Sequence, residues 1–153
     1  MKDSKPLEYI SKVLENMPSA WLDLTTHRLD IYNEALAKTE FLDNFECLFQ
    51  QNDYSISSLI ELRTAYDYIR LGHPLSCVLE WTIAGLNNLN AQNVITFSSR
   101  TSPVLAVLRK NLLSNKKTQI LYTDSLPECF NADVLREIYS YNFELKPINS
   151  AEE

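Results

Sequence analysis

The chain has 153 residues, about the length of one domain, and its 45% hydrophobic and 22% charged residues are close to the averages of globular proteins. This composition excludes a disordered chain, a collagen-like repeat and a disulfide scaffold. Two glycines, Gly72 and Gly85, are the total in the sequence, so phosphate loops built on several glycines are excluded as well.

The formal net charge of −6 is unevenly distributed. Residues 1–92 contain thirteen Asp or Glu against seven Lys or Arg, whereas residues 93–153 contain seven of each. The densest basic groups are the pairs Arg109-Lys110 and Lys116-Lys117, too few to bind a polyphosphate backbone by counterion release. We therefore expect no nucleic-acid partner.

Three cysteines without a CxxC spacing predict neither a disulfide framework nor a zinc site, and the two histidines have no partner at metal-ligand spacing. Reduced thiols are typical of the cytoplasm, which is the predicted location. No window approaches the roughly 18 apolar residues of a membrane span, so no membrane contact is expected. The sequence predicts no metal and no cofactor.

Residues 1–92 predict a helical part. The expected helices cover residues 7–17, one or two segments within 19–49, residues 56–69 and about 75–86. Pro18 ends the first of them, and Ser55 is a suitable N-cap for the helix that follows it. The break Gly72-His73-Pro74 is typical of one helix ending and another beginning.

Residues 93–148 predict alternating strands and helices. The order is strand, helix, strand, helix, strand, over residues 94–97, 104–113, 119–123, 132–141 and 143–148. Alternation at this spacing is typical of parallel strands joined by right-handed crossovers. We therefore predict an α/β fold, Rossmann-like and three-layered, in which the helical part packs on a three-stranded parallel βαβαβ sheet. The whole chain, with a tail at 149–153, is expected to form a single domain.

The strongest sign of a binding site lies between the first predicted strand and its helix. Four hydroxyl residues and one arginine gather there: Ser98, Ser99, Arg100, Thr101 and Ser102. Ser102 is a good N-cap and Pro103 a good first helical residue, so free N–H groups are expected at the carboxyl edge of the sheet. A helix N-terminus favours an anion, and Arg100 can add a bidentate contact. Alternatively, the hydroxyls only cap the helix and Arg100 is solvated.

The second predicted strand ends at the same edge of the sheet, in Thr123-Asp124-Ser125. Asp124 can hold a ligand hydroxyl there, as acidic residues after a second strand do in many α/β sites. The alternative is an Asx-turn, which the local sequence favours.

Strand 94–97, the Ser/Thr loop 98–102, helix 104–113 and the strand that runs into Thr123-Asp124-Ser125-Leu126-Pro127 together carry a resemblance. Residues 93–148 resemble the opening of a sugar isomerase (SIS) domain or of the translation initiation factor 2B/ribose-phosphate isomerase family. The resemblance implies that Ser98, Ser99, Thr101 and Ser102 bind the phosphate of a sugar phosphate. The usual glycine of the SIS loop is replaced by Arg100.

A competing resemblance is carried by Tyr66-Asp67-Tyr68-Ile69-Arg70, Pro74, Leu79-Glu80, Ile83-Ala84 and Phe97-Ser98-Ser99. Residues 66–113 resemble the segment of the pyridoxal-phosphate enzymes of cysteine and methionine metabolism where Tyr, Arg and a Ser-Gly loop bind the cofactor phosphate. The chain lacks the later Asp and the Schiff-base Lys, so it cannot be such an enzyme. Both resemblances imply a phosphate at residues 98–102.

The leading interpretation is a small cytoplasmic α/β protein that binds a small anionic, phosphorylated ligand at the Ser98 to Ser102 loop. No catalytic residue is assigned. The alternative is a noncatalytic interaction or regulatory protein whose acidic helical half docks a protein partner. The unpaired edges of a three-stranded sheet also predict a homodimer.

Overall fold

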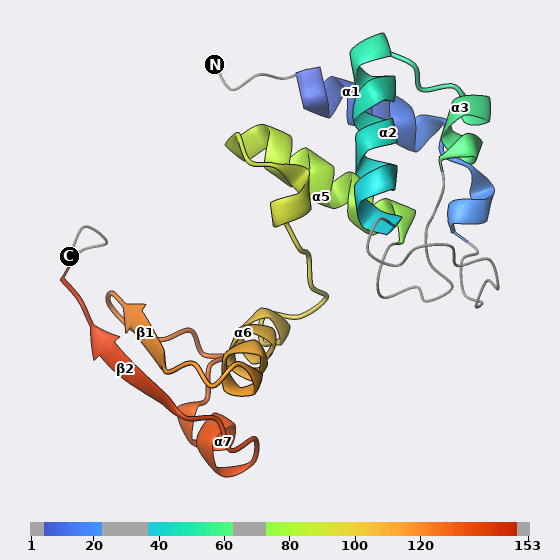
Figure 1. Cartoon of the computed structure of the whole chain (residues 1–153). Helices are drawn as coiled ribbons and strands as arrows, with labels where there is room; N and C mark the ends of the chain where they lie inside the picture. Colours follow the sequence, from blue (N-terminus) through green and yellow to red (C-terminus); the bar gives the residue numbers. More distant parts are fainter. Residues whose placement is uncertain (1–4, 23–36, 63–72, 150–153) are drawn as a thin grey trace. The chain divides into compact units, whose positions relative to one another are not determined.

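The computed structural model describes residues 5–22, 37–62 and 73–149 of the chain. They belong to two compact units, Met1–Thr96 and Phe97–Glu153, both drawn in Figure 1. Each unit has a hydrophobic core of its own. The boundary between the units falls inside the segment 94–97 that the sequence predicts as a strand.

The first unit is helical. Its elements are α1 (Lys5–Glu15), the 3-10 helix η1 (Ser19–Trp21), α2 (Ala37–Gln51), α3 (Ile56–Glu61), α5 (Pro74–Asn87) and the 3-10 helix η2 (Ala91–Asn93). The helices predicted at 7–17 and 75–86 are confirmed by α1 and α5. The predicted cap is confirmed too, because the side chain of Ser55 accepts a hydrogen bond from the N–H of Ser58. Residues 63–69 of that predicted helix lie outside the described residues.

The ends of α5 follow from its sequence. Nδ1 of His73 accepts a hydrogen bond from the N–H of Leu75 at 3.1 Å, and Pro74 stands in the first turn, where a missing N–H costs nothing. The helix ends at Asn88, whose φ of 54° is a left-handed conformation that Asn tolerates better than most residues. These ends define the helix that carries Glu80 and Trp81.

Aromatic side chains fill the core of the first unit. Phe45 of α2 is fully buried and meets Tyr9 of α1 and Trp81 of α5 edge-to-face, with ring centroids 5.7 and 5.2 Å apart. The hydroxyl of Tyr9 donates to the carbonyl of Asp53 at 2.7 Å, which satisfies the polar end of this buried ring. The core therefore joins α1, α2, α5 and the turn before α3.

The second unit contains α6 (Ser102–Leu113), β1 (Thr118–Tyr122), α7 (Ala132–Glu137) and β2 (Phe143–Pro147). The two strands pair in parallel, with Thr118 opposite Phe143, and α7 lies in the connection between them. Leu108 of α6, Leu135 of α7 and Phe143 of β2 form a small buried core. The strands predicted at 119–123 and 143–148 are confirmed by β1 and β2.

The predicted three-stranded, three-layered Rossmann-like fold is wrong. The described residues are mostly helical, with six α-helices and one two-stranded parallel sheet. Val94 and Thr96 do not pair with that sheet: the Val94 carbonyl accepts from Nζ of Lys38 at 2.6 Å, and the Thr96 N–H donates to Oε1 of Glu80 at 2.7 Å. Because side chains of the first unit satisfy these backbone groups, the segment needs no neighbouring strand.

Candidate functional site

The predicted anion loop, residues 98–102, leads into α6 of the second unit (Figure 1). Three of its hydroxyls meet at one oxygen: Ser99 Oγ lies 2.7 Å from Ser102 Oγ and 3.2 Å from Thr101 Oγ1. Ser99 Oγ also accepts a hydrogen bond from the N–H of Ser102 at 3.1 Å. Ser99 therefore organises the turn that begins the helix.

The capping differs from the sequence prediction. Ser102 is the first residue of α6 rather than its N-cap, and Thr101, at the cap position, makes no side-chain capping bond. The hydroxyl that accepts from the first helical N–H belongs to Ser99. Pro103 follows within the first turn, where it removes a donor that has no intrahelical partner.

Several donors at this turn have no acceptor among the described residues. Three hydroxyl protons share two oxygen–oxygen contacts, so at least one hydroxyl can donate elsewhere. The N–H of Val104 makes no backbone hydrogen bond with a described residue, as is usual in a first turn. Arg100 is exposed, and its guanidinium forms no ion pair with a described side chain. This arrangement suits an anion with several oxygen atoms.

Ser98 and Asp124 do not join the cluster around Ser99. Both are exposed, and neither side chain makes a hydrogen bond within the described part of the chain. Asp124 lies in the bend after β1, where it forms no Asx-turn either. The loop also does not follow a strand, because residues 94–97 are not one. The structure thus brings together Ser99, Thr101 and Ser102, with Arg100 beside them.

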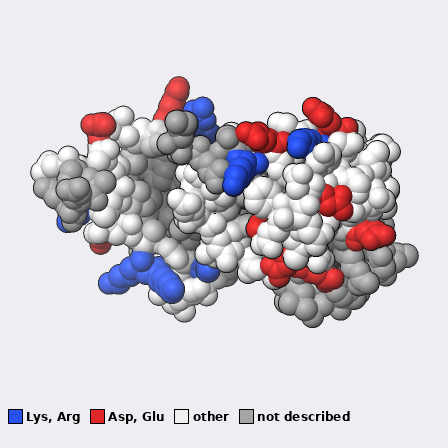
Figure 2. All heavy atoms as spheres, turned by 90° about the horizontal axis from the view of Figure 1, so that it is seen from above, with Lys and Arg blue, Asp and Glu red and all other residues white. Residues whose placement is uncertain are grey.

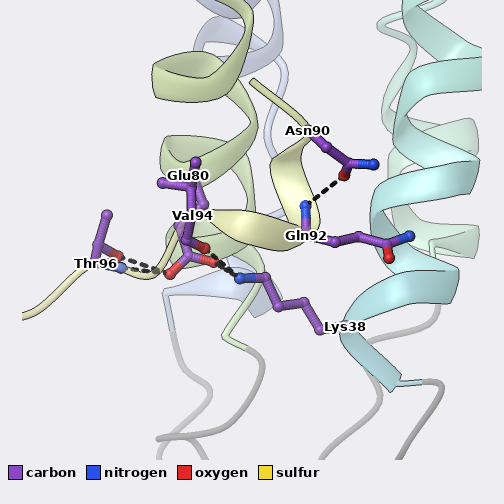
Figure 3. Close-up of polar contacts among 6 residues, drawn as sticks. All are labelled: Lys38, Glu80, Asn90, Gln92, Val94 and Thr96. Carbon is purple, nitrogen blue, oxygen red and sulfur yellow. Dashed lines mark hydrogen bonds and ion pairs between the residues drawn. The ribbon is translucent and has the colours of Figure 1, made fainter. Parts of the chain in front are cut away.

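A buried ion pair in the first unit is absent from the sequence predictions (Figure 3). Glu80 of α5 is 5% exposed, and its Oε2 pairs with Nζ of Lys38 on α2 at 2.5 Å. Its Oε1 accepts both the N–H and the hydroxyl of Thr96, at 2.7 and 3.1 Å. The signal in the sequence is a single carboxylate within the otherwise uncharged α5, where a buried charge requires a partner. Because Glu80 is buried and Lys38 already neutralises its charge, the pair holds structure rather than a ligand.

Two cavities are also absent from the sequence predictions, because their linings come from separate elements. One, of about 410 Å³, lies in the first unit between α2, α5 and η2. The other, of about 590 Å³, lies in the second unit beside the last turn of α6. Lys116 and Lys117 line the second cavity together with the buried Leu108 and Phe143, so it is a competing place for an anion.

The described residues contain no cluster of three His, Cys, Asp or Glu side chains able to hold a metal ion. None of the helices in the described ranges is long and apolar enough to cross a membrane. Figure 2 shows Lys and Arg side chains in separate small groups among neutral and acidic ones on the face drawn. On this face an anion is therefore attracted by individual basic groups and not by one continuous basic patch.

Comparison of the chain with protein-family models, with curated proteins and with solved structures finds no match.

Proposed function

We propose that the protein binds a small phosphorylated anion at the turn formed by residues 98–102. One observation carries the proposal: the hydroxyls of Thr101 and Ser102 converge on Ser99 Oγ at the start of a twelve-residue helix, beside an exposed Arg100. An anion there meets the positive end of the helix dipole, the N–H of Val104, a hydroxyl donor and a guanidinium. All of these donors favour the charged form of a phosphate oxygen.

The proposal is one of binding, and it assigns no reaction. A phosphate group matches the donor set because it offers several oxygens to donors that point from different directions. We propose a cytoplasmic location as well, since Cys47, Cys77 and Cys129 are all free thiols, which are typical of that compartment.

The test uses inorganic phosphate as the probe and thermal unfolding as the readout. A ligand that binds the native state alone raises its stability with concentration, so phosphate is expected to raise the Tm of the parent protein. Arg100→Ala removes a charged hydrogen-bond donor and is expected to weaken binding roughly 10- to 100-fold. Arg109→Ala is the matched control, because it removes an exposed arginine from the same helix away from the turn.

We expect Arg109→Ala to bind phosphate as tightly as the parent protein, and Arg100→Ala to bind it more weakly than either. Equal binding by Arg100→Ala and the parent would overturn the proposal. In that case the hydroxyls only cap α6, and the alternative of an interaction protein that uses its acidic helical half takes its place.

A further inference from the structure

The cavity of about 410 Å³ in the first unit lies between three helices and the turn that follows α5. Its walls come from α1 (Pro6), α2 (Leu42, Asp43, Glu46, Phe49), α5 (Trp81, Ala84, Gly85) and residues 89–92. The volume is in the range of sites for small organic molecules. All of the lining belongs to one compact unit, and the space is left open by two small residues, Ala84 and Gly85.

The charge on the lining is negative. Asp43 and Glu46 stand one turn apart on α2, and the lining contains no Lys, Arg or His. Asp43 is exposed and makes no hydrogen bond or ion pair with a described residue. Glu46 is half-buried and is held in place: its Oε2 accepts from Nε1 of Trp81 at 2.8 Å, and its Oε1 accepts from Nε2 of Gln50 at 3.2 Å.

The apolar part of the lining is aromatic. The rings of Phe49 and Trp81 stand edge-to-face with centroids 4.9 Å apart, and Trp81 is fixed further by its bond to Glu46. Aromatic faces attract cations, most strongly when the cation is partly withdrawn from water. Opposite α2, the side chains of Asn90 and Gln92 extend toward that helix, as Figure 3 shows, and they add amide groups to the rim.

We propose that this cavity binds a small organic ammonium ion, with its charge at Asp43 and Glu46 and its carbon atoms against Phe49 and Trp81. The site is independent of the anion turn, because every lining residue belongs to the other unit. A neutral apolar ligand fits less well, since it would withdraw carboxylates from water without pairing them.

A bare metal cation fits less well than an ammonium ion. Calcium takes six to eight oxygen ligands, whereas this cavity offers two carboxylates, one of which already accepts two hydrogen bonds. An ammonium ion needs fewer oxygens and gains from the aromatic wall that a hydrated metal ion would not use. The combination of two acids with a Trp–Phe wall therefore favours an amine with an apolar body.

The test follows the indole N–H signal of Trp81 by NMR while n-butylammonium is added at constant ionic strength. n-Butanol is the matched neutral probe, because it has the same carbon chain without the charge, and sodium ion controls for ionic strength. We expect n-butylammonium to shift the Trp81 signal in a saturable way, and the two control solutes to leave it in place. Saturable shifts that n-butanol produces as strongly, or no shift with n-butylammonium, would overturn the proposal.

Variants assign the charge. Asp43→Asn changes an exposed side chain, so the fold is retained, and Glu46→Gln keeps an oxygen for the Trp81 N–H. Each is expected to weaken n-butylammonium binding about five- to tenfold. Glu15→Gln is the control, because it removes an exposed carboxylate of the same unit that does not line the cavity. If Asp43→Asn binds as tightly as Glu15→Gln, the carboxylate has no part in binding and the proposal fails.

Discussion

Oε1 of Glu80 accepts two hydrogen bonds from one residue, Thr96: from its N–H at 2.7 Å and from its hydroxyl at 3.1 Å. The other oxygen, Oε2, is paired with Nζ of Lys38, and that nitrogen donates to the carbonyl of Val94. Two side chains from separate helices therefore hold both ends of the three-residue segment 94–96. This arrangement replaces the strand pairing that the sequence 94–97 predicts.

Glu80→Gln is expected to lower the free energy of unfolding by about 3 kcal/mol, because it removes one partner of a buried ion pair and leaves Lys38 without its counter-charge. Urea denaturation measures the loss. The control is a double-mutant cycle with Lys38→Met and the double variant Lys38→Met/Glu80→Gln. If the two groups interact, the stability loss of the double variant is expected to differ clearly from the sum of the two single losses. Additive losses would mean that the pair contributes nothing as a pair.

Ser99→Ala is expected to cost about 1 kcal/mol of stability, because Ser99 Oγ accepts the N–H of Ser102 and joins the other two hydroxyls. Ser102→Ala is expected to cost less, because that residue stands inside the helix and caps nothing. Denaturation curves of the two variants give the comparison. A larger loss of stability from Ser102→Ala would indicate that Ser102 is the capping residue, as the sequence predicts.

Gly85→Ala is expected to stabilise the protein by roughly 0.5–1 kcal/mol, the usual gain from replacing glycine within a helix. Space permits it: a Cβ at this position meets only Pro6, at 3.7 Å, which is ordinary van der Waals contact. Thermal unfolding measures the change. A lower Tm for Gly85→Ala would show that α5 does not accommodate a methyl group at this position.

Stability is expected to fall as the pH rises above about 9. Burial, with a smaller contribution from the charge of Glu80, raises the pKa of the Cys77 thiol from 9.0 to about 12. Burial and then the nearby Asp53 and Glu46 charges raise the pKa of Tyr9 above its ordinary 10.0. The native state therefore keeps protons that the unfolded chain has released, and each group lowers stability by about 1.4 kcal/mol per pH unit in its window.

Denaturation at a series of alkaline pH values checks this expectation. Tyr9→Phe removes the group that titrates later, so its stability is expected to fall less steeply above pH 10 than that of the parent. If the free energy of unfolding of Tyr9→Phe falls as steeply above pH 10 as that of the parent, Tyr9 is not the group that causes the fall. The same burial predicts that Cys77 does not react with thiol reagents at neutral pH. Cys47 is exposed, so burial does not protect it in this way.

The sequence predicts those elements whose pattern is local. The helical spacing behind Pro6, the cap at Ser55 and the strands at 119–123 and 143–148 all appear as predicted. The run Val94-Ile95-Thr96-Phe97 has the composition of a strand, but its backbone partners are Lys38 and Glu80, which lie far away in the chain. Local propensity cannot distinguish a backbone satisfied by a strand from one satisfied by side chains.

Part of the candidate site could likewise be predicted from the sequence, and part of it could not. The hydroxyl cluster is predictable because Ser99, Thr101 and Ser102 lie within one turn, although the choice of Ser99 as the capping residue depends on the backbone path. The position of Asp124 relative to the loop depended on a predicted strand that the structure does not contain. The acidic cavity combines residues from α1, α2, α5 and η2, which no local pattern in the sequence links.

The most direct measurement of the anion site is a titration of the ¹⁵N-labelled protein with inorganic phosphate, followed through its backbone amide signals. We expect saturable shifts confined to residues 99–104, with the N–H of Val104 among the largest, and a titration that needs roughly 10- to 100-fold more phosphate in Arg100→Ala but not in Arg109→Ala. Shifts at Lys116 and Lys117 with none at the turn, or no saturable shift at all, would contradict it.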